Sequence, residues 1–127
     1  MGIGHLAELA AYESDFTKYR VGAVVRNRTF TAVSWGTNKR KTHPAQSRHA
    51  KKVGMPDRQF LHAEIDAIVK FRGTPYSIEV CRITKKGNYG MARPCPICYR
   101  AIQEAGIKWI YYTDGKGNSI KEKVEGN

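Results

Sequence analysis

The strongest constraint on how this chain can fold is a set of three metal-ligating side chains that lie far apart in sequence. Residues 94–98 read Pro-Cys-Pro-Ile-Cys, a spacing that can place the thiolates of Cys95 and Cys98 on one metal ion. His62 supplies a third ligand from a segment well upstream. Three protein ligands leave the fourth tetrahedral position of Zn²⁺ open to water, which is the arrangement of a catalytic site. The carboxylate of Glu64 would stand beside that water, where it could move protons.

Both ligand segments open a predicted helix. Apolar residues recur at helical spacing over residues 62–71, and a glycine shortly afterwards ends the pattern. A second helix is predicted over residues 94–106, so that Cys95 and Cys98 share one face of its first turn. A further amphipathic helix over residues 5–13 is expected to cover one face of a sheet.

The strands are predicted from runs of β-branched and aromatic residues. Five such runs occupy residues 19–25, 30–35, 77–84, 107–112 and 119–124. A parallel crossover takes a dozen or more residues before its strand begins, so the last of these strands is expected to be antiparallel. Residues 113–127 are therefore read as an edge hairpin or tail.

These elements predict an α/β fold in which one domain spans residues 1–127. The sheet should be mixed, with four to five strands, and helices on both faces make it a three-layer α/β/α sandwich. The 41% of hydrophobic residues are enough for a core around a single sheet. Residues 38–61 are polar and basic and are interrupted by Pro44, Gly54 and Pro56, so a basic loop with a functional role is expected there.

The ordered set of motifs resembles the cytidine and deoxycytidylate deaminase superfamily of zinc-dependent nucleobase deaminases. His62-x-Glu64 followed by Pro94-Cys95-x-x-Cys98 is similar to the signature of that group. The similarity extends over residues 21–112, with Ala-Val-Val, Gly-Thr-Asn and Gly-Ile-Lys runs in family order. It implies a sandwich of the cytidine deaminase type, hence a single cytidine-deaminase-like domain. Because many relatives are oligomers, the resemblance also allows a homo-oligomer.

The resemblance implies a zinc-dependent hydrolase that converts cytosine to uracil. Zn²⁺ would be held by His62, Cys95 and Cys98. Glu64 would take a proton from water and deliver it to the ring nitrogen. The substrate implied is cytosine in a (deoxy)cytidine nucleotide or in single-stranded nucleic acid.

Four residues are expected to contact that substrate. By resemblance, Asn38 hydrogen-bonds the nucleoside, and the backbone amide of Ala63 meets the carbonyl group of the base. Tyr112 lies near the end of a predicted strand, where its ring could stack on the base. Pro94, directly before the first ligand cysteine, completes the set.

The positive charge is concentrated in one part of the chain. The sequence has 22 Lys and Arg against 11 Asp and Glu, and this net charge of +11 attracts polyanions. No acidic residue lies between Asp15 and Asp57. Six cations of the basic loop are expected to rim the pocket and to bind phosphate or nucleic acid: Lys39, Arg40, Lys41, Arg48, Lys51 and Lys52. Arg93 is a further candidate for a phosphate contact.

The cysteines and the N-terminal segment predict a cytoplasmic location. Three cysteines do not form a disulfide framework, and Cys95 and Cys98 need reduced thiols to bind a metal. Cys81 lies in a predicted strand and is read as a small buried hydrophobe. The first fifteen residues carry three acidic side chains and no long apolar run, so neither a signal peptide nor a membrane span is expected. No membrane partner is expected either.

Two other functions stay open at this point. The His-Ala-Glu-Ile run at residues 62–65 also resembles adenosine deaminases that act on RNA. Alternatively, the chain is a non-catalytic, basic nucleic-acid-binding module whose structural zinc takes a fourth ligand from His43 or His49. Glu64 favours catalysis, because a structural zinc site has no need of that carboxylate. The sequence leaves open whether the substrate is a free nucleotide or a polynucleotide, and whether its sugar is ribose or deoxyribose.

Overall fold

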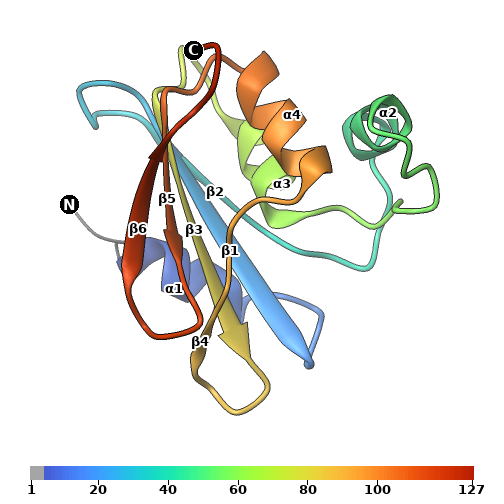
Figure 1. Cartoon of the computed structure of the whole chain (residues 1–127), viewed down its shortest axis with the longest axis vertical. Helices are drawn as coiled ribbons and strands as arrows, with labels where there is room; N and C mark the ends of the chain where they lie inside the picture. Colours follow the sequence, from blue (N-terminus) through green and yellow to red (C-terminus); the bar gives the residue numbers. More distant parts are fainter. Residues whose placement is uncertain (1–4) are drawn as a thin grey trace.

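The computed structural model describes residues 5–127 and contains one mixed β-sheet with helices on both faces (Figure 1). The helices are α1 (His5–Tyr12), α2 (Pro44–Lys52), α3 (Ala63–Lys70) and α4 (Pro96–Glu104). The strands are β1 (Tyr19–Arg26), β2 (Val33–Thr37), β3 (Ser77–Thr84), β4 (Tyr89–Gly90), β5 (Trp109–Thr113) and β6 (Ser119–Lys123). The strand order is β2-β1-β3-β5-β6, and the short β4 pairs with β3.

An apolar layer on each face of the sheet confirms the predicted three-layer α/β/α sandwich. On one face, Ala7 and Ala11 of α1 pack against Val24, Cys81 and Ile83 of the sheet. Cys81 is buried there as an apolar side chain, as expected. On the other face, a larger core joins α3 and α4 to β1, β3 and β5. None of the helices in the described part of the chain has the length and hydropathy needed to span a bilayer.

One parallel pair lies at the centre of a sheet that is otherwise antiparallel. β3 and β5 run parallel, and α4 lies in the connection between them. β6 pairs with β5 from Trp109↔Lys123 to Thr113↔Ser119. This pairing confirms the prediction of an antiparallel fifth strand.

The prediction of one long loop over residues 38–61 is wrong, because the middle of this segment forms helix α2 (Figure 1). The Nδ1 atom of His43 caps the helix by accepting a hydrogen bond from the Ala45 N–H at 3.0 Å, and Pro44 occupies the first turn. Ala50 packs into a core formed with α3 and α4. Most residues of α2 are polar or charged, so hydrophobic periodicity gave no signal for this helix.

Two smaller differences concern the strands. The second strand begins at Val33 rather than at Phe30, because the backbone of Phe30 has a positive φ of 59°, which a strand does not accommodate. The short strand β4 forms in the connection between β3 and α4, where no strand was predicted. Neither difference changes the layers of the fold.

Helix α3 lies in backbone contact with strand β2. A Cβ atom on Gly36 would stand 2.4 Å from the Ala67 nitrogen and 2.5 Å from the Ala63 oxygen, so only glycine permits this approach. The Ser34 hydroxyl donates a hydrogen bond to the Ala67 carbonyl at 2.7 Å. These contacts fix the height of α3 above the sheet and therefore the position of its first turn.

Replacing Gly36 with alanine is expected to lower the free energy of unfolding by about 1–3 kcal/mol, because α3 must move away from β2. Chemical denaturation measures the change. Gly115→Ala is the matched control, since nothing lies within 4 Å of a Cβ atom at that position. The control should change stability by about 0.5 kcal/mol or less. Equal stabilities of the two variants would contradict the close approach of α3 and β2.

Candidate active site

The fold brings the three predicted metal ligands together at the starts of α3 and α4. His62 is the residue directly before α3, Cys95 is the residue directly before α4, and Cys98 lies in the first turn of α4. The Nδ1 atom of His62 is 3.2 Å from the Cys98 sulfur and 3.6 Å from the Cys95 sulfur. Within residues 5–127, this is the only group of three or more His, Cys, Asp or Glu side chains whose donor atoms all lie within 4.8 Å of one another.

The donor geometry fits Zn²⁺. Ordinary zinc–sulfur and zinc–nitrogen bond lengths at a tetrahedral angle place the two kinds of donor about 3.6 Å apart. The distances from the imidazole nitrogen to the two sulfurs are close to that value. Two cysteine sulfurs and one imidazole nitrogen form a donor set typical of this ion.

The electrostatics of the donors also suit a cation. A hydrogen bond from Cys98 is the main cause that lowers the pKa of the Cys95 thiol to about 4, and a hydrogen bond with His62 adds to it. Burial raises the pKa of the Cys98 thiol, so this group keeps its proton and shares it with Cys95. Burial opposes a charge on His62, but its hydrogen bond with Cys95 and the nearby Glu64 carboxyl raise its pKa. Cys95 is thus the donor that most readily becomes a thiolate, the form in which a cysteine binds a metal ion.

Glu64 lies beside the three donors without being one of them. It is the second residue of α3 and is 6% exposed. Burial raises the pKa of its carboxyl group. A buried carboxyl next to a metal site, outside the ligand set, is placed to accept and release a proton.

A hollow of about 180 Å³ opens onto these groups and is called the zinc-side hollow. Its wall includes two of the ligands and Glu64. The residues that line it are Tyr19, Val21, Asn38, His62, Ala63, Glu64, Arg82, Met91, Ala92, Arg93 and Cys95. Asn38, Ala63 and Arg93 were expected from the sequence, whereas Arg82 was not. Arg82 lies in β3, for which the sequence predicted a strand and no functional residue.

A second hollow of about 270 Å³ adjoins the first and is called the aromatic hollow. The two hollows share Tyr19, Asn38 and His62. The remaining residues that line the aromatic hollow are Phe16, Asp57, Arg58, Gln59, Phe60 and Leu61. None of these residues was singled out from the sequence, because they belong to segments without hydrophobic periodicity or a known motif.

Asn38 lies where the two hollows meet, and its side chain is held by the backbone of β1. Its Oδ1 atom accepts a hydrogen bond from the Val21 N–H at 2.9 Å, and its Nδ2 atom donates to the Tyr19 carbonyl at 3.4 Å. The side chain is therefore fixed before any substrate arrives. Asn38 belongs to the wall that the two hollows share.

Two of the expected substrate contacts do not line either hollow. Tyr112 is 7% exposed and belongs to the core between β5 and the helices, with its hydroxyl 3.5 Å from Glu122 Oε1. Pro94 is buried and lines a separate depression beside Val53. Neither position faces the space in front of the three donors.

The expectation that the six cations of residues 39–52 rim the pocket as a set is wrong, since none of them lines either hollow. Arg40 does lie beside a lining residue, with its guanidinium 4.6 Å from the centroid of the Phe16 ring. Residues 44–52 form α2, which contacts α3 and α4 instead. Arg48 therefore faces Glu104 of α4, with 2.9 Å between NH1 and Oε1. Lys51 and Lys52 are exposed in the last turn of α2. The cations that do line the hollows are Arg58, Arg82 and Arg93.

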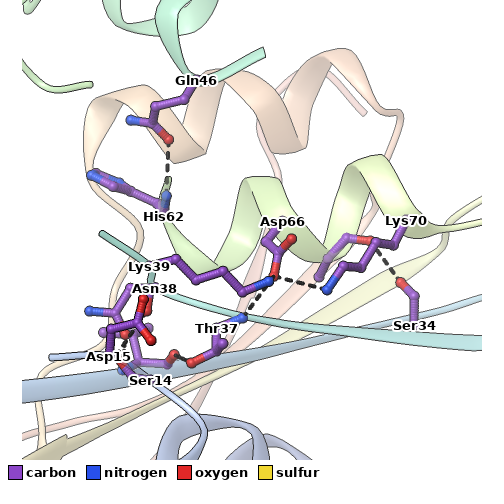
Figure 2. A network of polar contacts seen from close by, with 12 residues as sticks. Ser14, Asp15, Ser34, Thr37, Asn38, Lys39, Gln46, His62, Asp66 and Lys70 are labelled. Atoms are coloured by element: carbon purple, nitrogen blue, oxygen red, sulfur yellow. Dashed lines mark hydrogen bonds and ion pairs between the residues drawn. The ribbon is translucent and has the colours of Figure 1, made fainter. Parts of the chain in front are cut away.

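Lys39 forms an ion pair with Asp66 of α3 and does not extend into solvent (Figure 2). Its Nζ atom donates to Asp66 Oδ2 at 2.8 Å, and the same oxygen accepts from Lys70 Nζ and from the Thr37 N–H, each at 3.1 Å. Burial opposes ionisation of Asp66, but these hydrogen bonds hold its pKa below the usual range. The network ties the end of β2 to α3 and so places Asn38 opposite the start of α3.

Gln46 of α2 holds the ligand His62 in place (Figure 2). Its side chain is completely buried. The Oε1 atom accepts a hydrogen bond from the His62 N–H at 3.1 Å, and the Nε2 atom donates to the Arg58 carbonyl at 3.1 Å. Sequence reasoning missed Gln46 because it lies in the segment that was read as a loop.

Comparisons with known proteins agree with this geometry. The sequence model described as the cytidine and deoxycytidylate deaminase zinc-binding region matches residues 3–114. A cytidine deaminase from Burkholderia pseudomallei superposes with a TM-score of 0.63 at 19% identity, covering 94% of this chain and 87% of that one. A mutant cytidine deaminase from Mycobacterium tuberculosis superposes with a TM-score of 0.58 at 16% identity, and the match covers 96% of this chain and 88% of that one. At these identities the structures support the fold alone. No curated protein sequence matches the chain significantly.

Replacing Gln46 with leucine removes both hydrogen bonds while keeping a buried side chain of similar size. The variant is expected to bind zinc about 10- to 100-fold more weakly, because partners that orient a metal ligand contribute affinity in that range. Competition with a chromogenic chelator measures the affinity. Ser47→Ala, on the next residue of α2, should leave it unchanged. Wild-type affinity in the Gln46→Leu variant would show that Gln46 does not position the ligand.

Proposed function

The chain belongs to the cytidine and deoxycytidylate deaminase family, and from that premise we propose that it converts cytosine to uracil in a cytidine or deoxycytidine nucleotide. Its membership of this family, together with the donor set of one histidine and two cysteines, makes the protein a zinc-dependent hydrolytic deaminase. The observation that carries the proposed reaction is the placement of Glu64. This buried carboxyl lines the same hollow as His62 and Cys95 and is not one of the metal donors.

Glu64 carries the protons of the reaction. Zinc, when bound, makes a water molecule acidic enough to act as a nucleophile near neutral pH. Glu64 accepts the proton of that water as its oxygen bonds to C4 of cytosine, and passes it to ring nitrogen N3. Glu64 then takes the remaining proton from the new C4 hydroxyl group and delivers it to the amino group, so that the C4–N4 bond breaks, ammonia leaves and the C4 carbonyl forms. Cytosine and water are thus converted to uracil and ammonia.

The walls of the zinc-side hollow can orient the base. Ala63 is the first residue of α3, and the first N–H groups of a helix lack acceptors within that helix. The Ala63 amide is therefore suited to donate to the carbonyl oxygen of the base. Val21 and Met91 offer apolar surface to the ring, and Asn38 offers an amide to the sugar.

Arg82 favours a nucleotide over an uncharged nucleoside. Its guanidinium lies 5.1 Å from the centroid of the Tyr19 ring, at the wall of the zinc-side hollow. A phosphate bound in the hollow would give this guanidinium a charged partner. Arg93 also lines the hollow, but both its Nε and NH2 atoms already bind Glu122, at 3.0 and 2.9 Å.

A structural zinc module is disfavoured by the positions of the other histidines. A structural site has four protein ligands. His43 caps α2 through its Nδ1 atom, and the Nε2 atom of His49 lies 3.3 Å from Arg48. Within the described residues, neither joins the group of donor atoms. Three ligands with a neighbouring carboxyl suit catalysis instead.

Glu64→Gln is expected to reduce turnover at least about 100-fold, because the amide cannot carry protons, while zinc content and fold are kept. Ammonia release and base identity are scored with cytidine, CMP, dCMP, single-stranded DNA and RNA, and adenosine-containing oligonucleotides. Glu104→Gln is the matched control, since this carboxyl lies on the surface beside Arg48. Turnover within about tenfold of wild type would exclude Glu64 as the proton carrier. Conversion of adenine alone would contradict the assignment of cytosine.

A further inference from the structure

The aromatic hollow, at about 270 Å³, is larger than the zinc-side hollow, at about 180 Å³. It lies next to the zinc-side hollow and shares Tyr19, Asn38 and His62 with it. A ligand that fills the zinc-side hollow therefore has direct access to the aromatic hollow. A ligand with more than one base could place its second base there.

The wall of the aromatic hollow presents ring faces and edges to solvent. Phe60 is 50% exposed and Tyr19 is 42% exposed. The rings of Phe16 and Tyr19 are stacked, with centroids 5.6 Å apart and planes at 11°, and Phe60 meets Phe16 edge-on at 6.1 Å. Exposed aromatic side chains gathered in a concave surface favour a flat ligand that can stack on them.

Positive charge accompanies these rings. The Arg40 guanidinium lies 4.6 Å from the centroid of the Phe16 ring, and Arg58 lines the hollow itself. Two carboxylates are also present: Asp57 lines the hollow, and Asp15 accepts a hydrogen bond from the Arg40 N–H. The chain as a whole carries a net charge of +11, which favours a polyanion over a neutral aromatic ligand.

We propose that the aromatic hollow binds the base of a nucleotide adjacent to the target cytosine, so that the substrate class is single-stranded nucleic acid. Sites for single strands combine aromatic side chains, on which bases stack, with cations that follow the phosphates. Phe60 supplies the stacking surface beside the stacked pair of Phe16 and Tyr19, and Arg58 and Arg40 supply the charge. This assignment rests on the proposed deamination in the zinc-side hollow, although binding itself can be tested without turnover.

The binding test uses the zinc-loaded Glu64→Gln variant, which cannot consume the ligand. A trinucleotide with a central deoxycytidine should bind more tightly than dCMP. Adding Phe60→Ala should weaken trinucleotide binding about 5- to 150-fold, the loss expected when one stacked base is removed from an aromatic ring. Binding of dCMP should not change. Phe60→Tyr, which keeps the ring, should retain trinucleotide binding.

Phe30→Ala is the matched control for this test. Phe30 is also an exposed phenylalanine beside an arginine, at 42% exposure and 5.9 Å from Arg26. It lies in the connection between β1 and β2, at the end of β2 away from Asn38. Its replacement should leave binding of both ligands unchanged.

The outcomes separate this inference from the proposed reaction. Trinucleotide binding that depends on Phe60, in a protein that converts no cytosine substrate, would support the inference and overturn the reaction. Equal binding of trinucleotide and dCMP, or equal losses for both ligands in Phe60→Ala, would overturn the inference and leave the reaction in place. A dimer that dissociates on Phe60→Ala, seen by light scattering, would show that a second copy covers the hollow and would also overturn it.

Discussion

The structure depends on the meeting of two helix starts, because the ligand residues lie at the first turns of α3 and α4. The position of α3 follows from its backbone contact with β2 at Gly36. The position of α4 follows from an apolar core in which Ile65 of α3 meets Ile97, Cys98 and Ala101 of α4. A shift of either helix by a fraction of an ångström would separate the donor atoms of His62 and the two cysteines. Helix packing, at Gly36 and in this apolar core, thus sets the geometry of the metal site.

The sequence was sufficient to predict which three side chains come together as a possible metal site, the layers of the fold and the direction of the last strand. These features depend on motif spacing and on hydrophobic periodicity, which local sequence records directly. It was insufficient for α2, whose polar sequence is stabilised by a cap from His43 and by burial of Gln46 and Ala50. Gln46 acts by accepting a hydrogen bond from the distant His62 N–H, so the residues next to it in sequence do not identify it as a functional residue.

Charge was the least predictable property, because closeness in sequence does not place side chains on one surface. Lys39 and Lys70 turn toward the buried Asp66, where they stabilise the junction of β2 and α3 (Figure 2). Formation of α2 turns Arg48 toward α4. Two of the cations that line the hollows, Arg58 and Arg82, come from a loop and from a strand on opposite sides of His62 in sequence. Only the tertiary structure brings them beside the exposed aromatic rings.

The central claim is that three protein side chains hold zinc and leave its fourth position open beside Glu64. X-ray absorption at the zinc edge of the purified protein tests this claim most directly. The account predicts about one zinc per chain, with two sulfur atoms at about 2.3 Å, one imidazole nitrogen at about 2.0–2.1 Å and one light atom from solvent. A fourth protein ligand, such as a second imidazole, or a protein that binds no zinc, would contradict it.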